Sequence, residues 1–308
     1  MDNAKGYKAF KPGMICKDKQ YAENTDYEEV GGKICEKGMM HYCVNPFDVL
    51  NFYDLVDESG KFSDFAEVKA LDQPISGSDG KFAAKKLHIG AKLSFAGFIK
   101  ACIDYTKEQT IVNMPKSDVA TGDSAQIGSS GNSAQIGSSG NSARIGSSGD
   151  YARIGSSGDY AQIGSSGYSA QIGSSGDSAR IGSSGDYARI GSSGDYAQIG
   201  SSGDSARIGS SGDSARIGSS GYSAQIGSSG DSARIDSTGV DSVICCAGHG
   251  CTVKAKIGSW ITLAEWEYSE EKGRSVPRCV KTEYVDGEKI KADTWYRLEN
   301  GEFVEVNR

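Results

Sequence analysis

The sequence predicts a mainly β protein, in which a parallel β-solenoid lies between an N-terminal α+β domain and a small C-terminal antiparallel β cap. The main observation is a nine-residue phrase, D-S-A-R/Q-I-G-S-S-G, which is written thirteen times with little change between Asp123 and Gly239. A short fixed period is typical of a solenoid, because each unit can bury its apolar face only against its neighbours. The other two observations are mixed helix and strand patterns before the repeats and an alternating aromatic tail after them.

One repeat unit reads as a strand followed by a turn. We number its positions one to nine on Asp177–Gly185, so that Ala179 and Ile181 occupy positions three and five. These two side chains share one face of a strand and recur in every unit, which predicts that they form the interior. Gly182 and Gly185, at positions six and nine, are expected to supply the positive φ that a sharp corner needs.

The length of the unit predicts the size of the coil. Nine residues are too few to close a coil, so two units per coil is the economical arrangement, with a triangular three-unit coil as the alternative. Two units per coil give about six and a half coils and, at ~4.8 Å per rung, a rod about 31 Å long. Because the units are nearly identical, removing two of them is expected to shorten the rod by one rung and leave the end domains folded.

Breaks in composition divide the 308 residues into three segments. Residues 1–116 form the predicted head, residues 117–258 the solenoid and residues 259–308 the cap. The elements expected in the head are strands at Gly6–Phe10, Tyr27–Val30, Gly38–Cys43 and Phe62–Leu71, a helix that begins at Pro46 behind an Asn45 cap, and an amphipathic helix over Ser94–Tyr105.

Two runs in the head resemble an uncharacterised domain that is common in bacteriophage and prophage genes. They are Tyr7–Phe10, YKAF, and Cys35–Tyr53, CEKGMMHYCVNPFDVLNFY. In that family the domain is often followed by glycine-rich nine-residue repeats and a short C-terminal piece, as it is here. The resemblance implies a phage context, with the cytoplasm of the infected bacterial host as the location and a host protein as the partner. It implies no activity.

A second resemblance concerns chemistry. A strand, then a Gly-aromatic strand followed at once by a helix that ends in Tyr, is similar to the layout of the NAD pocket of ADP-ribosyltransferases. It implies that His41 and Tyr53 would flank a nicotinamide and that Glu67 would stabilise an oxocarbenium-like centre. Lys8 stands where such enzymes place Arg or His, and no second motif fixes Glu67. The sequence therefore favours a head without catalysis and without a cofactor.

The charge of the chain argues against nucleic acid as a direct partner. The net charge is −7, and the repeats hold ten Asp against seven Arg. A duplex carries about one negative charge per 1.7 Å, so the repeats are too nearly neutral to imitate one. The Asp and Arg columns of neighbouring rungs are instead expected to pair with each other.

A spacer or a protein-binding surface remains as the role of the solenoid. Tyr and Arg are enriched at protein interfaces, although the tyrosines could merely cover the corners of the coil. The candidate contact residues are Tyr151, Tyr160, Tyr187, Tyr196, Arg153 and Arg189.

After Gly239 the repeat degenerates. Val243 and Cys245 are expected in the slots of Ala and Ile, and a final rung continues the alternation from Cys251 to Ile257. Thiolate and imidazole groups are suitable zinc ligands, but their spacing here matches no common zinc phrase, so structural cysteines are favoured. The residues concerned are Cys245, Cys246, His249 and Cys251. The scattered spacing of all eight cysteines favours reduced thiols.

The tail predicts the cap. Trp260–Trp266 reads as a strand, and Asp286–Gly287 and Asn300–Gly301 read as hairpin turns. Such a sheet would close the last coil, and it could form a homo-oligomer if Trp260 and Trp266 were both exposed. We find no leader and no apolar run of membrane-spanning length, so no membrane association is expected.

Three functional hypotheses follow. The leading one is a phage-encoded, non-enzymatic interaction protein, including an inhibitor of a host defence system, that uses the solenoid as a spacer or binding surface. The alternatives are an ADP-ribosyltransferase-like enzyme in the head and a virion or tail-associated structural protein.

Overall fold

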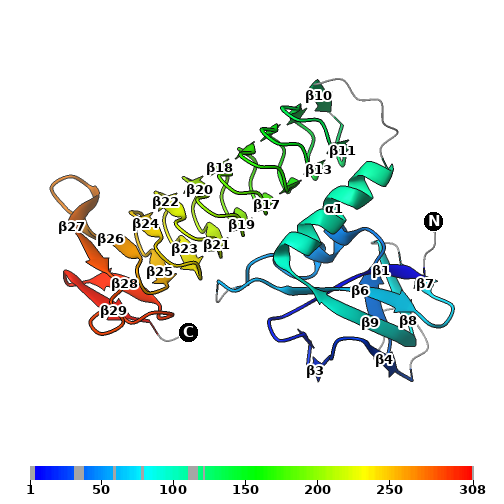
Figure 1. Ribbon diagram of the computed structural model, residues 1–308. Coiled ribbons are helices and arrows are strands. Elements are labelled where there is room, and N and C mark those ends of the chain that lie inside the picture. The colour runs from blue at the N-terminus through cyan, green and yellow to red at the C-terminus, as the bar shows by residue number, and fades with distance from the viewer. Residues whose placement is uncertain are drawn as a thin grey trace.

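The structure is a computed structural model, and it describes residues 4–30, 38–57, 60–77, 80–109, 117–120 and 122–306. It shows a parallel β-solenoid with an antiparallel sheet before it and antiparallel strands after it, so the predicted fold class is confirmed (Figure 1). The head lies along one side of the solenoid, and the cap lies at its far end.

The head is a seven-stranded antiparallel sheet with one long helix. Its elements are β1 (Lys5–Phe10), the hairpin β2 (Ile15–Cys16) and β3 (Lys19–Gln20), β4 (Thr25–Glu28), β5 (Met40–Cys43), the 3-10 helix η1 (Pro46–Asn51), β6 (Asp64–Ala70), β7 (Ile75–Ser76), β8 (Lys81–Ala84), β9 (Lys86–Leu93) and α1 (Phe95–Gln109). The strand order is β4-β9-β6-β1-β5-β8-β7. The sequence did not predict β8 and β9, whose lysines interrupt the apolar alternation.

The helices of the head form where the sequence predicted them. The Asn45 side chain accepts a hydrogen bond from the Phe47 N–H at 3.1 Å, and Pro46 begins η1. Phe98 of α1 stacks on Phe65 of the sheet with a centroid distance of 3.7 Å. Ile99 is also buried, but it faces the solenoid, so α1 lies between two layers.

The solenoid has two units per coil, so each strand pairs in parallel with the strand 18 residues later. Alternate strands belong to two sheets. We call the sheet that faces away from the head the open sheet; it contains β10 (Ser117–Ala120), β12 (Gln135–Ser138), β14 (Arg153–Ser156), β16 (Gln171–Ser174), β18 (Arg189–Ser192), β20 (Arg207–Ser210), β22 (Gln225–Ser228), β24 (Val243–Cys246) and β26 (Trp260–Ser269). We call the other the covered sheet; it contains β11 (Gln126–Ser129), β13 (Arg144–Ser147), β15 (Gln162–Ser165), β17 (Arg180–Ser183), β19 (Gln198–Ser201), β21 (Arg216–Ser219), β23 (Arg234–Ser237) and β25 (Thr252–Ala255).

The interior of the solenoid consists of stacked identical residues. Ile at position five lies on Ile of the next coil, as in the pair Ile190 and Ile208, and both are buried. Ala at position three is fully buried in the central coils, for example Ala188 and Ala206, so the two predicted interior positions are confirmed. Ser at position seven is a third inward column that the sequence analysis did not identify.

The corners are not built as the sequence predicted. The left-handed residue is the one at position two, where Ser178 has a φ of 56° and Tyr187 a φ of 58°. The repeat glycines do not have a left-handed φ. Instead, Gly185 at position nine lies against the backbone of Gly167 in the preceding coil. A Cβ atom at position nine would lie under 3.0 Å from that carbonyl oxygen, so glycine is required for close approach and not for φ.

The expected pairing of Asp with Arg between rungs is wrong. The Asp177 side chain accepts a hydrogen bond from the Asp195 N–H of the next coil at 2.9 Å, and the same contact recurs along both corners. Asn132 makes it equally, to the Asp150 N–H at 3.1 Å. The carboxylates therefore join coils through the backbone, and their charge is not needed.

This ladder leads to a prediction for the corner residues. Replacing Asp177 by Asn should leave the free energy of unfolding nearly unchanged, whereas alanine should lower it by about 1 kcal/mol, because one hydrogen bond between coils is lost. Chemical denaturation of the two variants measures the difference. Equal losses for Asn and Ala would show that the charge, and not the acceptor, stabilises the corner.

At the end of the repeats the observed register differs by one residue from the predicted one. Ile244 occupies the Ile slot and Cys246 the inward Ser slot, while Val243 and Cys245 point outward. The next rung follows the prediction from Cys251 to Ala255, but Ile257 is exposed. The register differs because Val240 takes position one after Gly239, so that Asp241 and Ser242 stand one position later than Asp and Ser do in the repeat.

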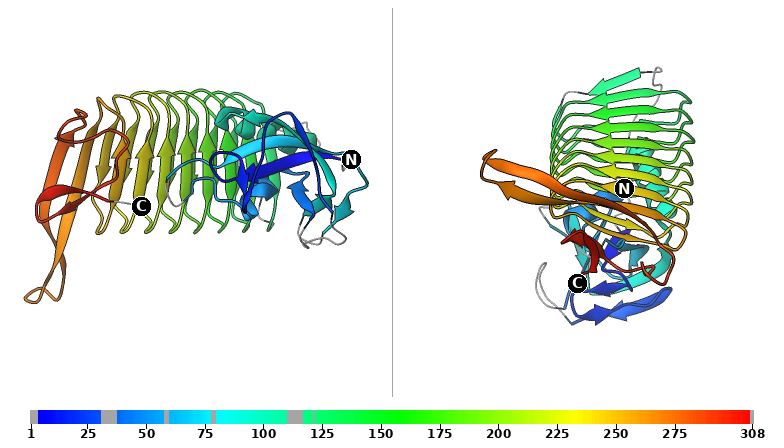
Figure 2. Two further views of the ribbon diagram at one scale, coloured as in Figure 1. Left: turned by 90° about the horizontal axis from the view of Figure 1, so that it is seen from below. Right: turned by 90° about the vertical axis from the view of Figure 1, so that its left-hand side faces the viewer.

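The cap ends both sheets with antiparallel strands. It consists of the long hairpin of β26 and β27 (Arg274–Tyr284), which projects from the rod in Figure 2, and of β28 (Tyr296–Glu299) with β29 (Glu302–Glu305). The β26 strand pairs with β24, and β28 pairs with β25. The last coil therefore has no unpaired parallel edge that could recruit another chain.

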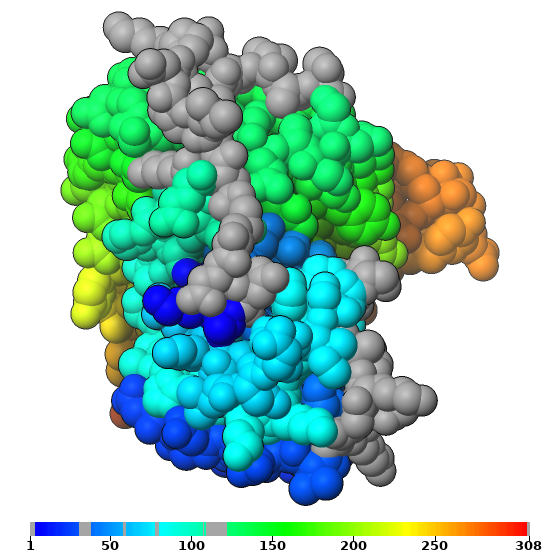
Figure 3. All heavy atoms as spheres, turned by 90° about the vertical axis from the view of Figure 1, so that its right-hand side faces the viewer, coloured from blue at the N-terminus to red at the C-terminus, as the bar shows by residue number. Residues whose placement is uncertain are grey.

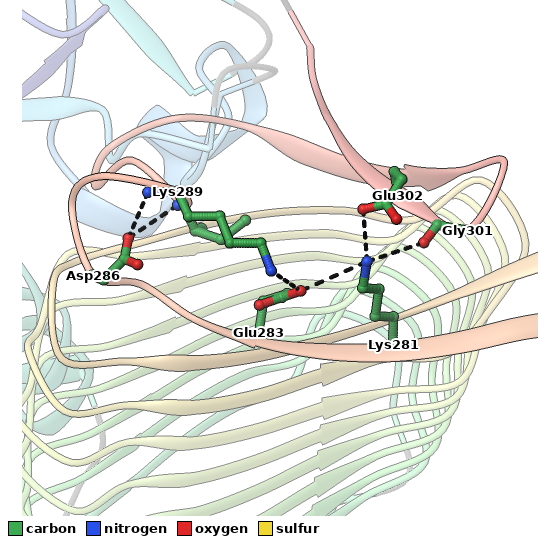
Figure 4. A network of polar contacts seen from close by, with 7 residues as sticks. Lys281, Glu283, Asp286, Lys289, Gly301 and Glu302 are labelled. Carbon is green, nitrogen blue, oxygen red and sulfur yellow. Dashed lines mark hydrogen bonds and ion pairs between the residues drawn. The ribbon is translucent and has the colours of Figure 1, made fainter.

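Polar contacts hold the two parts of the cap together (Figure 4). The Lys281 ammonium group donates to the Gly301 carbonyl at 3.3 Å and to the Glu302 carboxylate at 2.6 Å. Asn300–Gly301 forms the predicted hairpin turn between β28 and β29. Asp286–Gly287 does not form one, since the Asp286 carboxylate accepts three backbone N–H groups of its own loop, which also lower its pKa.

The tryptophans of the cap differ in exposure. The Trp260 side chain is exposed and packs on Tyr284, whereas Trp266 is half-buried and donates its indole N–H to the Ala247 carbonyl at 2.9 Å.

In the part of the chain that the structure describes, no helix is long and apolar enough to cross a membrane.

Candidate functional site

The covered sheet binds the head through its column of glycines at position six. A row of apolar side chains from the head lies on this column, and each side chain lies about one rung further along than the one before. At Gly146 the neighbours are the backbone of Ile103 and the side chain of Thr106, after which Ile99 and Ile103 lie on Gly164, Ile99 and Phe95 on Gly182, Phe95 and Phe62 on Gly200, and Phe62 on Gly218. Glycine in a strand commonly marks such close approach of another element. In Figure 3 the head atoms lie directly against the solenoid.

A polar row runs beside the apolar row, along position four of the covered sheet. The Asp48 carboxylate pairs with Arg144, and the Asp54 carboxylate pairs with Arg216 at 2.8 Å. Asp54 also accepts a hydrogen bond from the Gln198 side chain at 3.1 Å. The head thus recognises the repeat surface by two rows: apolar groups on Gly, and acidic groups on Arg and Gln.

The contact of head and solenoid ends at a buried ion pair. At the glycine positions of the last two covered coils the chain carries Asp236 and Lys254, whose charged atoms are 2.7 Å apart. Lys254 lies 5.1 Å from the Trp295 ring centre of the cap, and Gly60 of the head lies against Asp236 and Trp295. The head therefore spans the covered sheet from Gly146 to the cap.

Substitutions at two glycines of position six test the contact between the head and the solenoid. Leucine in place of Gly182 would collide with Ile99, so we expect it to push α1 away from the solenoid and to lower stability by about 1–3 kcal/mol. The matched control is Gly173→Leu on the open sheet, where a Cβ atom meets nothing within 4 Å. Limited proteolysis should cut the Gly182→Leu head faster than the wild-type head. Equal cleavage of the two variants would contradict the assigned interface.

The open sheet presents the same two columns without a covering element. Arg153 and Arg189, both predicted as contact residues, are exposed there together with Arg207. Gly155, Gly173, Gly191 and Gly209 form the floor of a long shallow groove between the Arg/Gln column and the serines of position eight. The structure therefore places Arg153 and Arg189 on one continuous surface.

The predicted tyrosines lie at two different corners. Tyr151 and Tyr187 precede strands of the open sheet, and Tyr168 lies between them with ring centres 5.9 Å and 5.2 Å away. Tyr160 and Tyr196 precede strands of the covered sheet, on the opposite edge. All five are exposed, and they lie at the corners rather than in the groove, whose lining consists of strand residues and the residues of position eight.

The residues predicted for an NAD pocket come from separate elements of the head. His41 lies on β5 and Glu67 on β6, and β1 runs between these strands. Tyr53 follows η1, and its hydroxyl contacts the Cys16 thiol at 3.0 Å, while the Glu67 side chain is exposed.

Lys8 occupies the place that the second resemblance assigns to Arg or His. Its ammonium group is buried and donates to the His41 carbonyl at 2.9 Å, and burial lowers the pKa of Lys8.

The four candidate zinc ligands have different surroundings. Cys245 is exposed on the open sheet, Cys246 and Cys251 are inside the solenoid, and His249 lies at a corner. In the described ranges, no group of three or more His, Cys, Asp or Glu side chains is arranged to hold a metal ion.

The groove was not predicted from the sequence, because the glycine of position six reads there as part of the turn. Position six, however, lies inside the strand Arg180–Ser183, between an inward Ile and an inward Ser. An outward glycine repeated in every strand is the signal that could have indicated a groove.

Comparison with known proteins identifies one domain. Residues 4–101 match a family model described as a domain of unknown function, DUF7666. No curated protein and no solved structure matches the chain.

Proposed function

We propose that this protein is a non-enzymatic interaction protein and that the open sheet is its binding surface. The observation that supports this proposal is the contrast between two chemically equivalent faces. The head covers the glycine column on one face, while the other presents exposed Arg153, Arg189 and Arg207 beside an open glycine floor. Arg beside a flat accessible floor suits a protein partner better than a small substrate.

The proposed partner is a protein of a bacterial host, including a component of a defence system, which a phage-encoded chain would meet in the host cytoplasm. The resemblance of Tyr7–Phe10 and Cys35–Tyr53 to a domain of phage and prophage genes supports this part. A homo-oligomer through the cap remains a prediction, and the half-buried Trp266 reduces the exposed apolar surface that it would use.

Affinity capture from a bacterial host lysate tests the binding surface. Gly173→Leu with Gly191→Leu would fill the groove without a clash at Cβ, because a Cβ atom at either position meets nothing within 4 Å. We expect wild-type protein to retain a host protein that this double variant loses. Ser205→Tyr is the control, since it places a tyrosine at a corner position where the chain already has one at Tyr187. Capture that survives the double variant would contradict a role for the open sheet.

The enzyme alternative gives a different result. If the head bound NAD, adding NAD should raise its unfolding temperature, and His41→Ala should abolish that rise. We expect no rise in either protein, because His41 and Glu67 lie on strands separated by β1.

A further inference from the structure

The open sheet is a second copy of the surface that binds the head. Because each coil contains two units, the same nonapeptide builds both sheets, with Gly at position six and Arg or Gln at position four. On the covered sheet the glycine column is buried under Ile103, Ile99 and Phe95 of α1. On the open sheet a Cβ atom at Gly155, Gly173, Gly191, Gly209 or Gly227 would meet nothing within 4 Å.

The covered sheet shows which ligand this surface accepts. The row formed by Phe95, Ile99 and Ile103 has a spacing of four residues, which is about 6 Å along a helix, and it follows rungs about 4.8 Å apart. Each four-residue step therefore moves the contact by about one glycine: the side chains of Ile103, Ile99 and Phe95 lie in turn on Gly164, Gly182 and Gly200. A helix with apolar residues at i, i+4 and i+8 can thus lie on three or four successive glycines.

Charge decides which kind of helix fits. Asp48 and Asp54 of the head pair with Arg144 and Arg216 on the covered sheet. The corresponding residues of the open sheet, Arg153, Arg189 and Arg207, are exposed, and in the described part of the chain no ion pair joins them to a carboxylate. A ligand of this face should therefore carry carboxylates beside its apolar row.

We propose that the open sheet binds an amphipathic helix of a partner protein, with apolar residues at four-residue intervals on the glycine column and acidic residues against Arg153, Arg189 and Arg207. This inference rests on the proposed function and adds the class of ligand. The helix binds as α1 binds the covered sheet, so the solenoid holds its own head on one face and a foreign helix on the other.

Two peptides built on α1 test the proposal. Both contain residues 94–109, which keep Phe95, Ile99 and Ile103, and both carry a hydrocarbon staple between positions 97 and 101 on the opposite face, since a short isolated helix is marginal in water. One carries Phe98→Glu and Cys102→Glu, which place acidic groups beside the apolar row. The other carries Phe98→Lys and Cys102→Lys.

Fluorescence anisotropy with the labelled peptides and the full-length protein measures binding. We expect the acidic peptide to bind at least tenfold more tightly than the basic one. Gly173→Leu with Gly191→Leu should weaken its binding at least tenfold, and the corner control Ser205→Tyr should not change it. Circular dichroism and thermal unfolding verify that both variants keep the fold.

Three outcomes of the peptide experiment would overturn the proposal. They are a lack of saturable binding, equal binding of both peptides, and binding that the groove-filling variant leaves unchanged. Sedimentation gives another: a wild-type dimer that the same variant dissociates would show that a second copy of the chain occupies the open sheet. If the peptides fail while host-protein capture still depends on Gly173 and Gly191, the helix is wrong and the binding surface stands.

Discussion

Alanine at Gly194 is expected to unfold part of the solenoid, whereas alanine at Gly191, three residues earlier, should be tolerated. Gly194 is at position nine, where a Cβ atom would lie under 3.0 Å from the Gly176 carbonyl of the preceding coil. Two backbones cannot separate there without breaking the hydrogen bonds between coils, so we expect a loss of about 3 kcal/mol or more. At Gly191 a Cβ atom meets nothing within 4 Å, and the φ is not left-handed.

The two variants should change the free energy of unfolding in opposite directions. Gly191→Ala restricts the unfolded chain without a clash in the folded one, so it should raise the free energy of unfolding by up to about 1 kcal/mol. Chemical denaturation, followed by circular dichroism, measures both effects. Similar losses at the two positions would mean that position six is packed as closely as position nine, which would contradict the open groove.

The repeats were the most predictable part of the fold. Strict alternation placed Ala179 and Ile181 inside, and the length of the unit favoured two units per coil over the three-unit alternative, because both expectations follow from strand geometry. The role of each glycine could not be predicted in the same way. A glycine that allows positive φ and one that allows close approach look identical in a sequence, and the neighbour that decides between them comes from another coil or from the head.

Contacts between the head and the solenoid also limit how many repeat units the chain can have. From the repeats alone, two units could be removed freely. In the structure, Phe95 lies on Gly182 while Gly60 of the same head lies against Asp236 and Trp295. Removing one coil would move Asp236 by one rung relative to the head, so the number of repeats is matched to the length of the head. No pattern within the repeats contains this information.

For the candidate site residues, the sequence predicted which side chains point outward better than it predicted which of them lie together. Arg153 and Arg189 lie on the open sheet because position four points outward, which the alternation requires. The tyrosines were divided between two corners because consecutive units lead into opposite sheets. His41 and Glu67 were linked only by a resemblance, and the strand order of the head, which local patterns do not determine, separates them.

The ion pair of Asp236 and Lys254 is expected to make stability depend on pH in an unusual direction. Burial raises the pKa of Asp236 to about 6, while the nearby Lys254 opposes the rise. Asp293 adds to the rise, and Lys61 counteracts it. A carboxyl group whose pKa is higher in the folded than in the unfolded protein stabilises the fold when protonated, and this contribution is lost as the pH rises through about 6.

At neutral pH, replacing Asp236 should therefore raise the free energy of unfolding, whereas replacing Lys254 should lower it. Asp236→Asn imitates the protonated acid, so at pH 7.5 it should be more stable than wild type, and this advantage should shrink by about 2 kcal/mol at pH 4.5. Lys254→Met leaves the buried carboxylate without its cation, which should cost about 3–5 kcal/mol at pH 7.5 and much less at pH 4.5. The control is Lys86→Met, which removes an exposed ion pair with Glu28 in the head sheet.

Denaturant unfolding at the two pH values measures these differences. Taking each variant relative to wild type removes the titration of all other carboxyl groups, which the proteins share. If Asp236→Asn were less stable than wild type at pH 7.5, the attraction of Lys254 would outweigh the cost of burying the Asp236 carboxylate, and the assigned direction of its pKa would be wrong. If instead the predicted signs hold, the end of the covered sheet, where Gly60 contacts Asp236 and Trp295, loosens as the pH rises through about 6. The contact between head and cap should then exchange backbone amide hydrogens faster at pH 7.5 than the Ile99 contact does, after correction for the intrinsic rate.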